Sequence, residues 1–288
     1  MNTKLHCKYP VFVMSGGDPQ RRKLLETIDP DERYKSKALL PFLGKRLIDW
    51  QLEALNRSPY IEGLYLIGLS AEDASFNFPV HYVPGATTAE FADKLIAGIS
   101  YLSANEKNPS LVVISSCDTP GIQTQHINQF FEKLNALPES EFVLSLVPEH
   151  LIEAAFPHSK RVVLGFRDIK LVPGELYALS PRAIREGYKL ISEISTRRRK
   201  IDRQAHKINP MPVIRLLAQK PLMWGLILKY LLGKATMSEA ERVFSKTFGY
   251  QTRGVIISDA GFGMDLDLPE DYERLKTYLN AQVNSEVV

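Results

Sequence analysis

VFVMSGG, residues 11–17, is a short apolar run that ends in a pair of glycines, and it begins the regular pattern of the chain. An apolar run of this length predicts a buried strand over Val11–Ser15. Glycines directly after a strand let backbone N–H groups approach phosphate oxygens, because no Cβ stands in the way. The same pair can also form an ordinary turn, so the segment establishes a first strand and leaves its chemistry open.

Outward from this strand, short apolar runs alternate with helical patterns as far as residue 150. The spacing predicts a helix over Leu47–Asn56, with its leucines and Ile48 on one side. Further strands are predicted at Leu64–Gly68, Val80–Val83, Leu111–Ser115 and Phe142–Val147, and further helices at Phe91–Leu102 and Ile127–Leu137. This alternation predicts parallel βαβ units in a layered α/β sheet. Catalytic groups are then expected beyond the carboxyl ends of the strands, where several loops converge.

The pattern changes after residue 160. Strands are predicted at Val162–Phe166, Leu171–Val172, Leu176–Ser180 and Val255–Ser258. Helices are predicted at Pro181–Ser192, Val213–Leu232, Ser238–Phe248, and Pro269 to about Leu279. The second of these helices has a potential break at Pro221. Ser238 and Glu241 have the spacing of a capping box. We expect residues 1–194 and 251–288 to form the α/β core, and residues 195–250 to form an inserted helical subdomain.

Bulk composition limits the class of protein. The 288 residues are 44% hydrophobic and 24% charged, values typical of a globular chain with a sizeable core. The formal net charge of +3 fits an anionic small-molecule substrate and falls short of the basic density of a nucleic-acid-binding protein. Cys7 and Cys117 lack the spacing of a disulfide scaffold or zinc site, which indicates a cytoplasmic location. The apolar stretch Leu222–Leu232 is too interrupted to span a membrane.

A carboxylate follows the strand predicted just after residue 110. The segment VVISSCDTP, residues 112–120, places Asp118 at the carboxyl end of that strand. A carboxylate there is suited to hold a divalent cation that bridges triphosphate oxygens. It is equally suited to cap the next helix.

Two more carboxylates and a lysine complete the candidate site. In GFGMDLDLPED, residues 261–271, Asp265 and Asp267 alternate along an extended segment and therefore project to one face. Two carboxylates on one face repel each other, and a cation between them would relieve that repulsion. Asp267 could instead cap the helix that begins near Pro269. In KSKALLPFLGKRLI, residues 35–48, Lys37 either supplies a cation close to the glycine turn or is a solvated lysine beside a buried strand.

These segments, in this order, resemble the nucleotide-diphospho-sugar transferase superfamily, and within it the molybdenum-cofactor guanylyltransferase-like NTP transferases. The similarity spans residues 11–150 and returns at 252–280, whereas residues 195–250 have no counterpart in the standard members. The resemblance implies a three-layer α/β/α Rossmann-like, GT-A-like fold with a mixed sheet and a helical insertion. It further implies Mg²⁺-dependent transfer of NMP from an NTP to a phosphorylated sugar, alcohol or cofactor-precursor acceptor, with release of pyrophosphate.

The resemblance also assigns roles to individual residues. By this resemblance the catalytic residues are Lys37 and Asp118, and the Mg²⁺ ligands are Asp118 with Asp265 or Asp267. The acceptor contacts are Gly174 and Glu175. The nucleotide site comprises Ser15, Gly16, Gly17, Lys37, Thr88 and Lys94. The sequence departs from the family in two places. The glycine loop carries Arg21 and Arg22 without a clear equivalent of the usual loop arginine, and Lys94 replaces a common asparagine.

Three alternatives stay open at this point. A GT-A-type glycosyltransferase would share the architecture but normally carries Asp-x-Asp at the central strand, where this chain has Cys117-Asp118-Thr119. A catalytically silent nucleotide-binding protein would account for the altered glycine loop. The basic run Arg197–Lys200 and the apolar residues that follow, within 197–232, could contact an anionic membrane, although a subdomain core or a homodimer contact is favoured.

Overall fold

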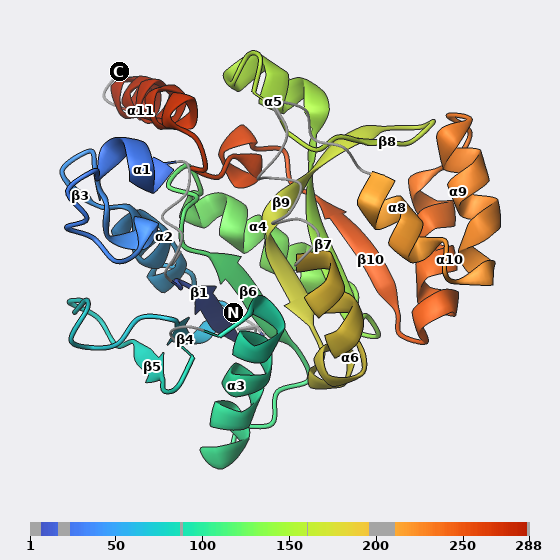
Figure 1. The fold of residues 1–288 in the computed structure, drawn as a ribbon, viewed down its shortest axis with the longest axis horizontal. Coiled ribbons are helices and arrows are strands. Elements are labelled where there is room, and N and C mark those ends of the chain that lie inside the picture. Colours follow the sequence, from blue (N-terminus) through green and yellow to red (C-terminus); the bar gives the residue numbers. More distant parts are fainter. Residues whose placement is uncertain (1–6, 17–23, 87–88, 160, 196–210, 287–288) are drawn as a thin grey trace, which may run out of the picture.

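The computed structural model describes residues 7–16, 24–86, 89–159, 161–195 and 211–286 (Figure 1). Within this part of the chain, an eight-stranded sheet forms the centre of the molecule. Its strands are β1 Tyr9–Met14, β4 Ile61–Ile67, β5 His81–Val83, β6 Val112–Ser116, β7 Phe142–Pro148, β8 Leu164–Gly165, β9 Lys170–Leu179 and β10 Thr252–Ile256, and a separate hairpin pairs β2 Pro41–Phe42 with β3 Lys45–Arg46.

The strand order is β10-β7-β9-β6-β1-β4-β5, with β8 paired to β9. The pairs β1–β4, β1–β6, β4–β5 and β7–β10 are parallel, whereas β9 runs antiparallel to β6, β7 and β8. The sheet is therefore mixed and mostly parallel, as predicted. Because β1 and β6 are parallel neighbours, the loops after them emerge at the same edge of the sheet.

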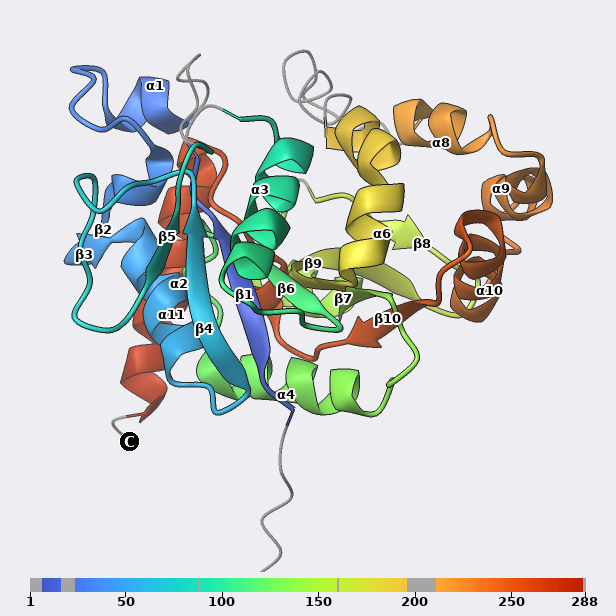
Figure 2. The ribbon, with the colours of Figure 1, turned by 90° about the horizontal axis from the view of Figure 1, so that it is seen from below.

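Helices cover both faces of this sheet (Figure 2). The helices are α1 Leu24–Ile28, η1 Lys37–Leu39, α2 Leu47–Asn56, α3 Phe91–Ala104, α4 Thr124–Asn135, α5 Glu149–Ala155, α6 Pro181–Glu186, α8 Met211–Leu217, η2 Pro221–Met223, α9 Trp224–Leu231, α10 Met237–Phe248, η3 Ala260–Gly263 and α11 Pro269–Glu286. The apolar residues of α2, α4 and α11 pack on one face, and those of α3 and α6 pack on the other. The three-layer fold is confirmed.

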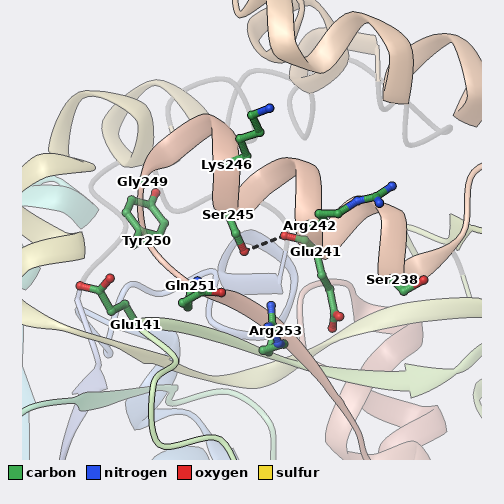
Figure 3. Close-up of a pocket in the computed structure, with 10 residues that line it drawn as sticks. All are labelled: Glu141, Ser238, Glu241, Arg242, Ser245, Lys246, Gly249, Tyr250, Gln251 and Arg253. Carbon is green, nitrogen blue, oxygen red and sulfur yellow. Dashed lines mark hydrogen bonds between the residues drawn. The ribbon is translucent and has the colours of Figure 1, made fainter.

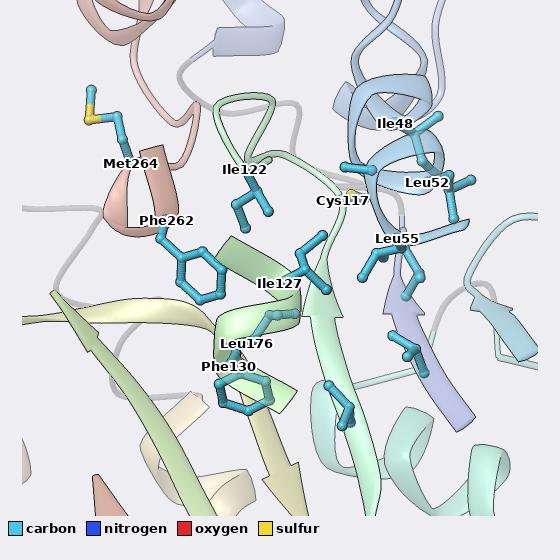
Figure 4. Packing of buried hydrophobic residues seen from close by; sticks show 14 of the residues in the cluster. Ile48, Leu52, Leu55, Cys117, Ile122, Ile127, Phe130, Leu176, Phe262 and Met264 are labelled. Carbon is cyan, nitrogen blue, oxygen red and sulfur yellow. The ribbon is translucent and has the colours of Figure 1, made fainter. Parts of the chain in front are cut away.

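The alternation of side chains along the strands builds two cores. In β1, Val11 and Val13 join the core beneath α2 and α4, whereas Phe12 joins the core beneath α3. Figure 4 shows the first core, where Leu52 of α2 and Phe130 of α4 approach the sheet from the same side. Both cores are almost fully buried, so they fix the strand ends that carry the polar loops.

Residues 211–250 form helices with a third hydrophobic cluster. Its buried members are Met223, Leu226, Ala235 and Ala240, from η2, α9, α10 and the turn between them. None of the helices in the described residues is long and apolar enough to cross a membrane. The predicted helix Val213–Leu232 is divided at the anticipated break, because a 3₁₀ turn begins at Pro221, which cannot donate to a helical hydrogen bond.

Other sequence expectations need correction. The capping box of α10 uses Thr236 and Glu239, each side chain accepting from the other's backbone N–H at 3.2 Å, so the prediction of Ser238 and Glu241 was wrong by two residues. Glu241 instead accepts a hydrogen bond from the Gly254 amide at 2.7 Å. The two strands predicted within 171–180 are one strand, β9, whose Pro173 stands beside a register shift in β7. A proline in an inner strand is tolerated at such an irregularity.

Candidate active site

Two loops far apart in sequence cross at the carboxyl end of β6. The backbone N–H of Leu266 donates to the carbonyl of Asp118 at 2.9 Å. Nearby, Gly121 and Gly261 approach so closely that a Cβ added at Gly261 would lie 2.3 Å from the Gly121 carbonyl oxygen. Only glycines permit this approach, and it holds the segment around residue 266 against the loop that follows β6.

This crossing brings three carboxylates together. One oxygen each of Asp118, Asp265 and Asp267 lies within 4.8 Å of the others. Asp118 and Asp265 are buried, and Asp267 is partly exposed. Asp265 and Asp267 flank the buried Leu266, as expected for alternate residues of an extended segment.

Lys37 reaches the same cluster from the short helix η1. Its Nζ contacts the carboxylate of Asp118 and lies 2.6 Å from Oδ1 of Asp267. Ser36 caps η1 and donates its hydroxyl to the Gly16 carbonyl at 3.2 Å, which connects η1 to the end of β1. Burial alone would lower the pKa of Lys37, but the two carboxylates raise it well above its usual range. The ammonium is therefore a fixed positive charge between the two aspartates.

Arg161 is a member of the site that the sequence did not reveal. Its guanidinium contacts the carboxylate of Asp265, donates to the Asp265 carbonyl at 2.7 Å, and lies 3.2 Å from Oδ2 of Asp271. It stands just before the predicted strand Val162–Phe166, in a stretch with no motif. Its role follows only from the fold, which places it beside carboxylates more than 100 residues away.

The donor set fits a divalent cation. Carboxylate oxygens are the ligands that Mg²⁺ prefers, and it commonly takes one or two of them together with substrate phosphates. Three aspartates surround the single ammonium of Lys37, while Arg161 pairs with Asp265 and Asp271, and Arg274 pairs with Asp271 at 3.2 Å. The carboxylates still outnumber the cations, so a divalent cation would offset the excess negative charge. Because Lys37 already lies between Asp118 and Asp267, the ammonium has to share or leave that position when a metal binds.

The described part of the predicted nucleotide loop lies beside this cluster. The hydroxyl and the backbone N–H of Ser15 both donate to the Ile67 carbonyl, at 3.3 and 2.9 Å, so this side chain is turned into the protein. Gly68 approaches Gly16 so closely that a Cβ on Gly68 would lie 2.6 Å from the Gly16 Cα. The ends of β1 and β4 are thereby held together, with backbone rather than side chains at their surface.

The remaining nucleotide residues have different outcomes. Gly17 and Thr88 lie outside the described residues. Lys94 is buried in α3, where burial lowers its pKa, and its charge acts on Cys117. Burial and the carboxylate of Asp118 raise the pKa of the Cys117 thiol to about 12, so it stays protonated at neutral pH. Lys94 is therefore on the side of the end of β6 where Cys117 lies.

The two predicted acceptor residues lie on β9. A Cβ at Gly174 would be 2.4 Å from the Ser145 hydroxyl and 3.1 Å from the Phe262 ring, so this glycine provides room for core packing. Glu175, the next residue, is buried, and by alternation it faces the α3 side of the sheet. The structure thus brings together Lys37 and the three aspartates, and places Gly174 in a packing contact.

A large cavity lies elsewhere in the molecule. It has a volume of about 720 Å³ and is bordered by α10, β10 and Glu141 (Figure 3). Figure 3 shows Arg242 and Lys246 pointing away from the strands, whereas Glu241 points toward Arg253. Neither Lys37 nor any of the three aspartates of the cluster lines this cavity. We assign the chemistry to the cluster, because charges of opposite sign converge there from distant elements.

Comparison with known proteins identifies the family of the chain and its fold. Residues 11–206 match the family model of the MobA-like NTP transferase domain. A solved hypothetical transferase from Thermus thermophilus is similar over 92% of this chain and 99% of its own, with 22% identity and a TM-score of 0.67. CMP:2-keto-3-deoxy-manno-octonic acid synthetase complexed with CTP is similar over 96% of this chain and 99% of its own, with 12% identity and a TM-score of 0.56.

A nucleotidyl transferase from Methanothermobacter is similar over 95% of this chain and 99% of its own, with 12% identity and a TM-score of 0.51. No curated protein matches the chain in sequence. At these identities the solved structures establish the fold, whereas the family model covers well over half of the chain.

Proposed function

The chain belongs to the family of MobA-like NTP transferase domains, and from this premise we propose that it transfers a nucleoside monophosphate from an NTP to a small-molecule acceptor. The acceptor would be a phosphorylated sugar, alcohol or cofactor precursor, and pyrophosphate would be released. The observation that carries the proposal is the convergence of Asp118, Asp265 and Asp267 around the ammonium of Lys37, at the edge of the sheet where β1 and β6 end.

The reaction is an in-line attack of an acceptor oxygen on the α-phosphorus of the NTP. Such a transfer needs positioning and charge neutralisation more than covalent help. Asp118, with Asp265 or Asp267, would hold Mg²⁺, which supplies positive charge to the phosphate oxygens and orients them. Lys37 neutralises charge that develops toward the leaving pyrophosphate, and backbone N–H groups after β1 contact the phosphates.

Arg161 acts as a positioning residue in this scheme. Its contacts with Asp265 and Asp271 fix the segment that carries the second metal ligand. Arg161 neutralises part of the charge on Asp265, as Lys37 does for Asp118 and Asp267.

The direct test is a matrix of the four NTPs with Mg²⁺ against sugar phosphates and alcohol phosphates, read by pyrophosphate release. We expect release with one combination, and a loss of roughly 10²–10³-fold in Asp118→Asn, the effect of removing one electrostatic contact to the transition state. Asp31→Asn is the matched control, because Asp31 is exposed and pairs only with Arg33 among the described residues.

Two outcomes would contradict the proposal. Full activity of Asp118→Asn would remove the metal-ligand role. Consumption of sugar nucleotides with no pyrophosphate release from any NTP would favour a glycosyltransferase, and NTP binding without turnover would favour a silent nucleotide-binding protein.

A further inference from the structure

Helix α9 carries apolar side chains on two sides, and the described residues cover only one of them. Toward the protein, Met223 and Leu226 are buried, and α9 closes an apolar cavity of about 260 Å³ above β7 and β10. On the other side, each of five large apolar side chains has more than half of its surface exposed, namely Leu222, Trp224, Leu228, Leu231 and Leu232. A helix that is apolar all round is normally buried in a core or in contact with a membrane.

These side chains form the main concentration of exposed apolar surface in the described residues. Seven large hydrophobic residues are exposed there, and five of them fall within residues 222–232. Single exposed apolar residues are ordinary, whereas a contiguous group indicates an interaction site. We call these five residues the α9 face.

The indole of Trp224 is oriented for an apolar contact. Its N–H donates to the Ala218 carbonyl at 2.7 Å, while the side chain as a whole stays largely exposed. The polar atom of the ring is therefore satisfied inside the protein, and the exposed surface is carbon. Because this hydrogen bond holds the ring in place, little side-chain entropy is lost when the ring packs against another surface.

Within the segment that carries the α9 face, the charged residues are all basic. Residues 211–236 contain Arg215, Lys220, Lys229 and Lys234 and no Asp or Glu. Arg215, Lys220 and Lys234 are exposed, and Lys229 pairs with Glu239 at 2.6 Å. A second copy of the chain docked by two-fold symmetry would bring these cations toward one another. An anionic phospholipid surface would instead attract them, because each cation near such a surface strengthens binding.

We propose that the α9 face, together with Lys220 and Lys234, binds the surface of a bilayer rich in anionic phospholipid. The apolar side chains enter the interfacial region, and the lysines contact lipid phosphates. This inference is independent of the proposed nucleotidyl transfer, because none of its residues belongs to the carboxylate cluster.

The test uses the full chain and vesicles of phosphatidylcholine, either alone or mixed with phosphatidylglycerol. We expect co-sedimentation with the mixed vesicles, a decrease of binding with added salt, and a blue shift of tryptophan emission that Trp224→Phe abolishes. Replacing Lys220 and Lys234 by Gln should weaken binding about fivefold for each charge removed. Leu228→Glu should weaken it at least about tenfold, because a charge replaces an exposed apolar anchor.

Two matched variants serve as controls. Lys276→Gln removes a lysine from α11 with a comparable degree of exposure, and Ile28→Ser removes an exposed apolar side chain from α1. Both should bind vesicles as the wild type does. The proposal is overturned if the wild type binds neither kind of vesicle, or if the controls weaken binding as much as the α9 variants. Sedimentation showing a dimer that Leu228→Glu dissociates, without vesicle binding, would assign the surface to a second copy.

Discussion

Replacing Lys37 by Met tests whether its ammonium occupies a cation site. The substitution removes the charge that lies between Asp118 and Asp267 and leaves their carboxylates facing each other. Breaking a fully buried ion pair costs about 3–5 kcal/mol, and breaking an exposed one costs less than about 1 kcal/mol. The side chains of Lys37 and Asp118 are 27% and 10% exposed, so we expect a loss of about 2 kcal/mol in the free energy of unfolding.

Urea unfolding in the presence of a chelator and of increasing Mg²⁺ measures this effect. Lys45→Met is the matched control, since Lys45 is 29% exposed and pairs with Glu53 at 2.7 Å away from the cluster. At a Mg²⁺ concentration about 100 times the dissociation constant, binding to the folded state adds about 2.7 kcal/mol, enough to restore Lys37→Met. The carboxylates raise the pKa of Lys37 above its ordinary 10.5, so the wild-type contribution is fully present at neutral pH.

The gain from Mg²⁺ should be larger in Lys37→Met than in the wild type, because no ammonium competes with the metal. Pyrophosphate release should nevertheless stay low by roughly 10²–10³-fold, since the metal cannot replace the contact between Lys37 and the phosphates. If Mg²⁺ stabilises Lys37→Met no more than Lys45→Met, the ammonium of Lys37 does not occupy the cation site and this reasoning fails.

Three further substitutions test the packing and electrostatics around the site by urea unfolding. Arg161→Met should lower the free energy of unfolding by about 3 kcal/mol, because the largely buried Asp265 loses the guanidinium that it contacts, while Asp271 retains Arg274; a wild-type midpoint would contradict this. Gly98→Ala places a methyl group 2.6 Å from the Phe12 ring. It should lower the free energy of unfolding by about 1 kcal/mol, after the gain in helix propensity is subtracted. Gly225→Ala is the control and should be neutral or stabilising, because a Cβ there has nothing within 4 Å. Burial raises the pKa of the Asp259 carboxyl above its ordinary 3.8. The folded state therefore holds this proton more tightly than the unfolded state, and the free energy of unfolding falls as pH rises from 3.8 through the folded-state pKa. The stability of Asp259→Asn relative to the wild type should therefore increase with pH across that window, and a constant difference would refute the argument.

Local patterns predicted most of the fold, because hydrophobic periodicity depends on near neighbours. The bounds of α2, Leu47–Asn56, are those of the prediction, and the strands at β1, β4, β6 and β7 differ from it by a few residues at most. The convergence of Asp118 with the carboxylates near residue 266 follows from a topological rule, since parallel strands end at one edge of the sheet. The helices α1 and α5 were not predicted, as neither is longer than two turns.

What the sequence could not supply depends on contacts between distant residues. Nothing near Arg161 indicates that it pairs with Asp265, because that contact exists only after the two loops cross. The α9 face is a similar case. The leucines of α9 read equally well as core or surface from sequence, and only the packing of α9 on α10 and the sheet shows which of them stay exposed.

The placement of the insert makes the site and the α9 face separable. Residues 211–250 precede β10, which pairs with β7 at the edge of the sheet, whereas the Leu266 hydrogen bond to Asp118 fixes the carboxylate segment to the centre. Within the described residues α9 packs mainly against η2 and α10, so we expect a change on the α9 face to leave the aspartates in place. Leu228→Glu should lose vesicle binding and keep pyrophosphate release, and Asp118→Asn should do the reverse. Loss of both properties in either variant would mean that the membrane surface and the catalytic site are coupled, and that the insert regulates the transfer.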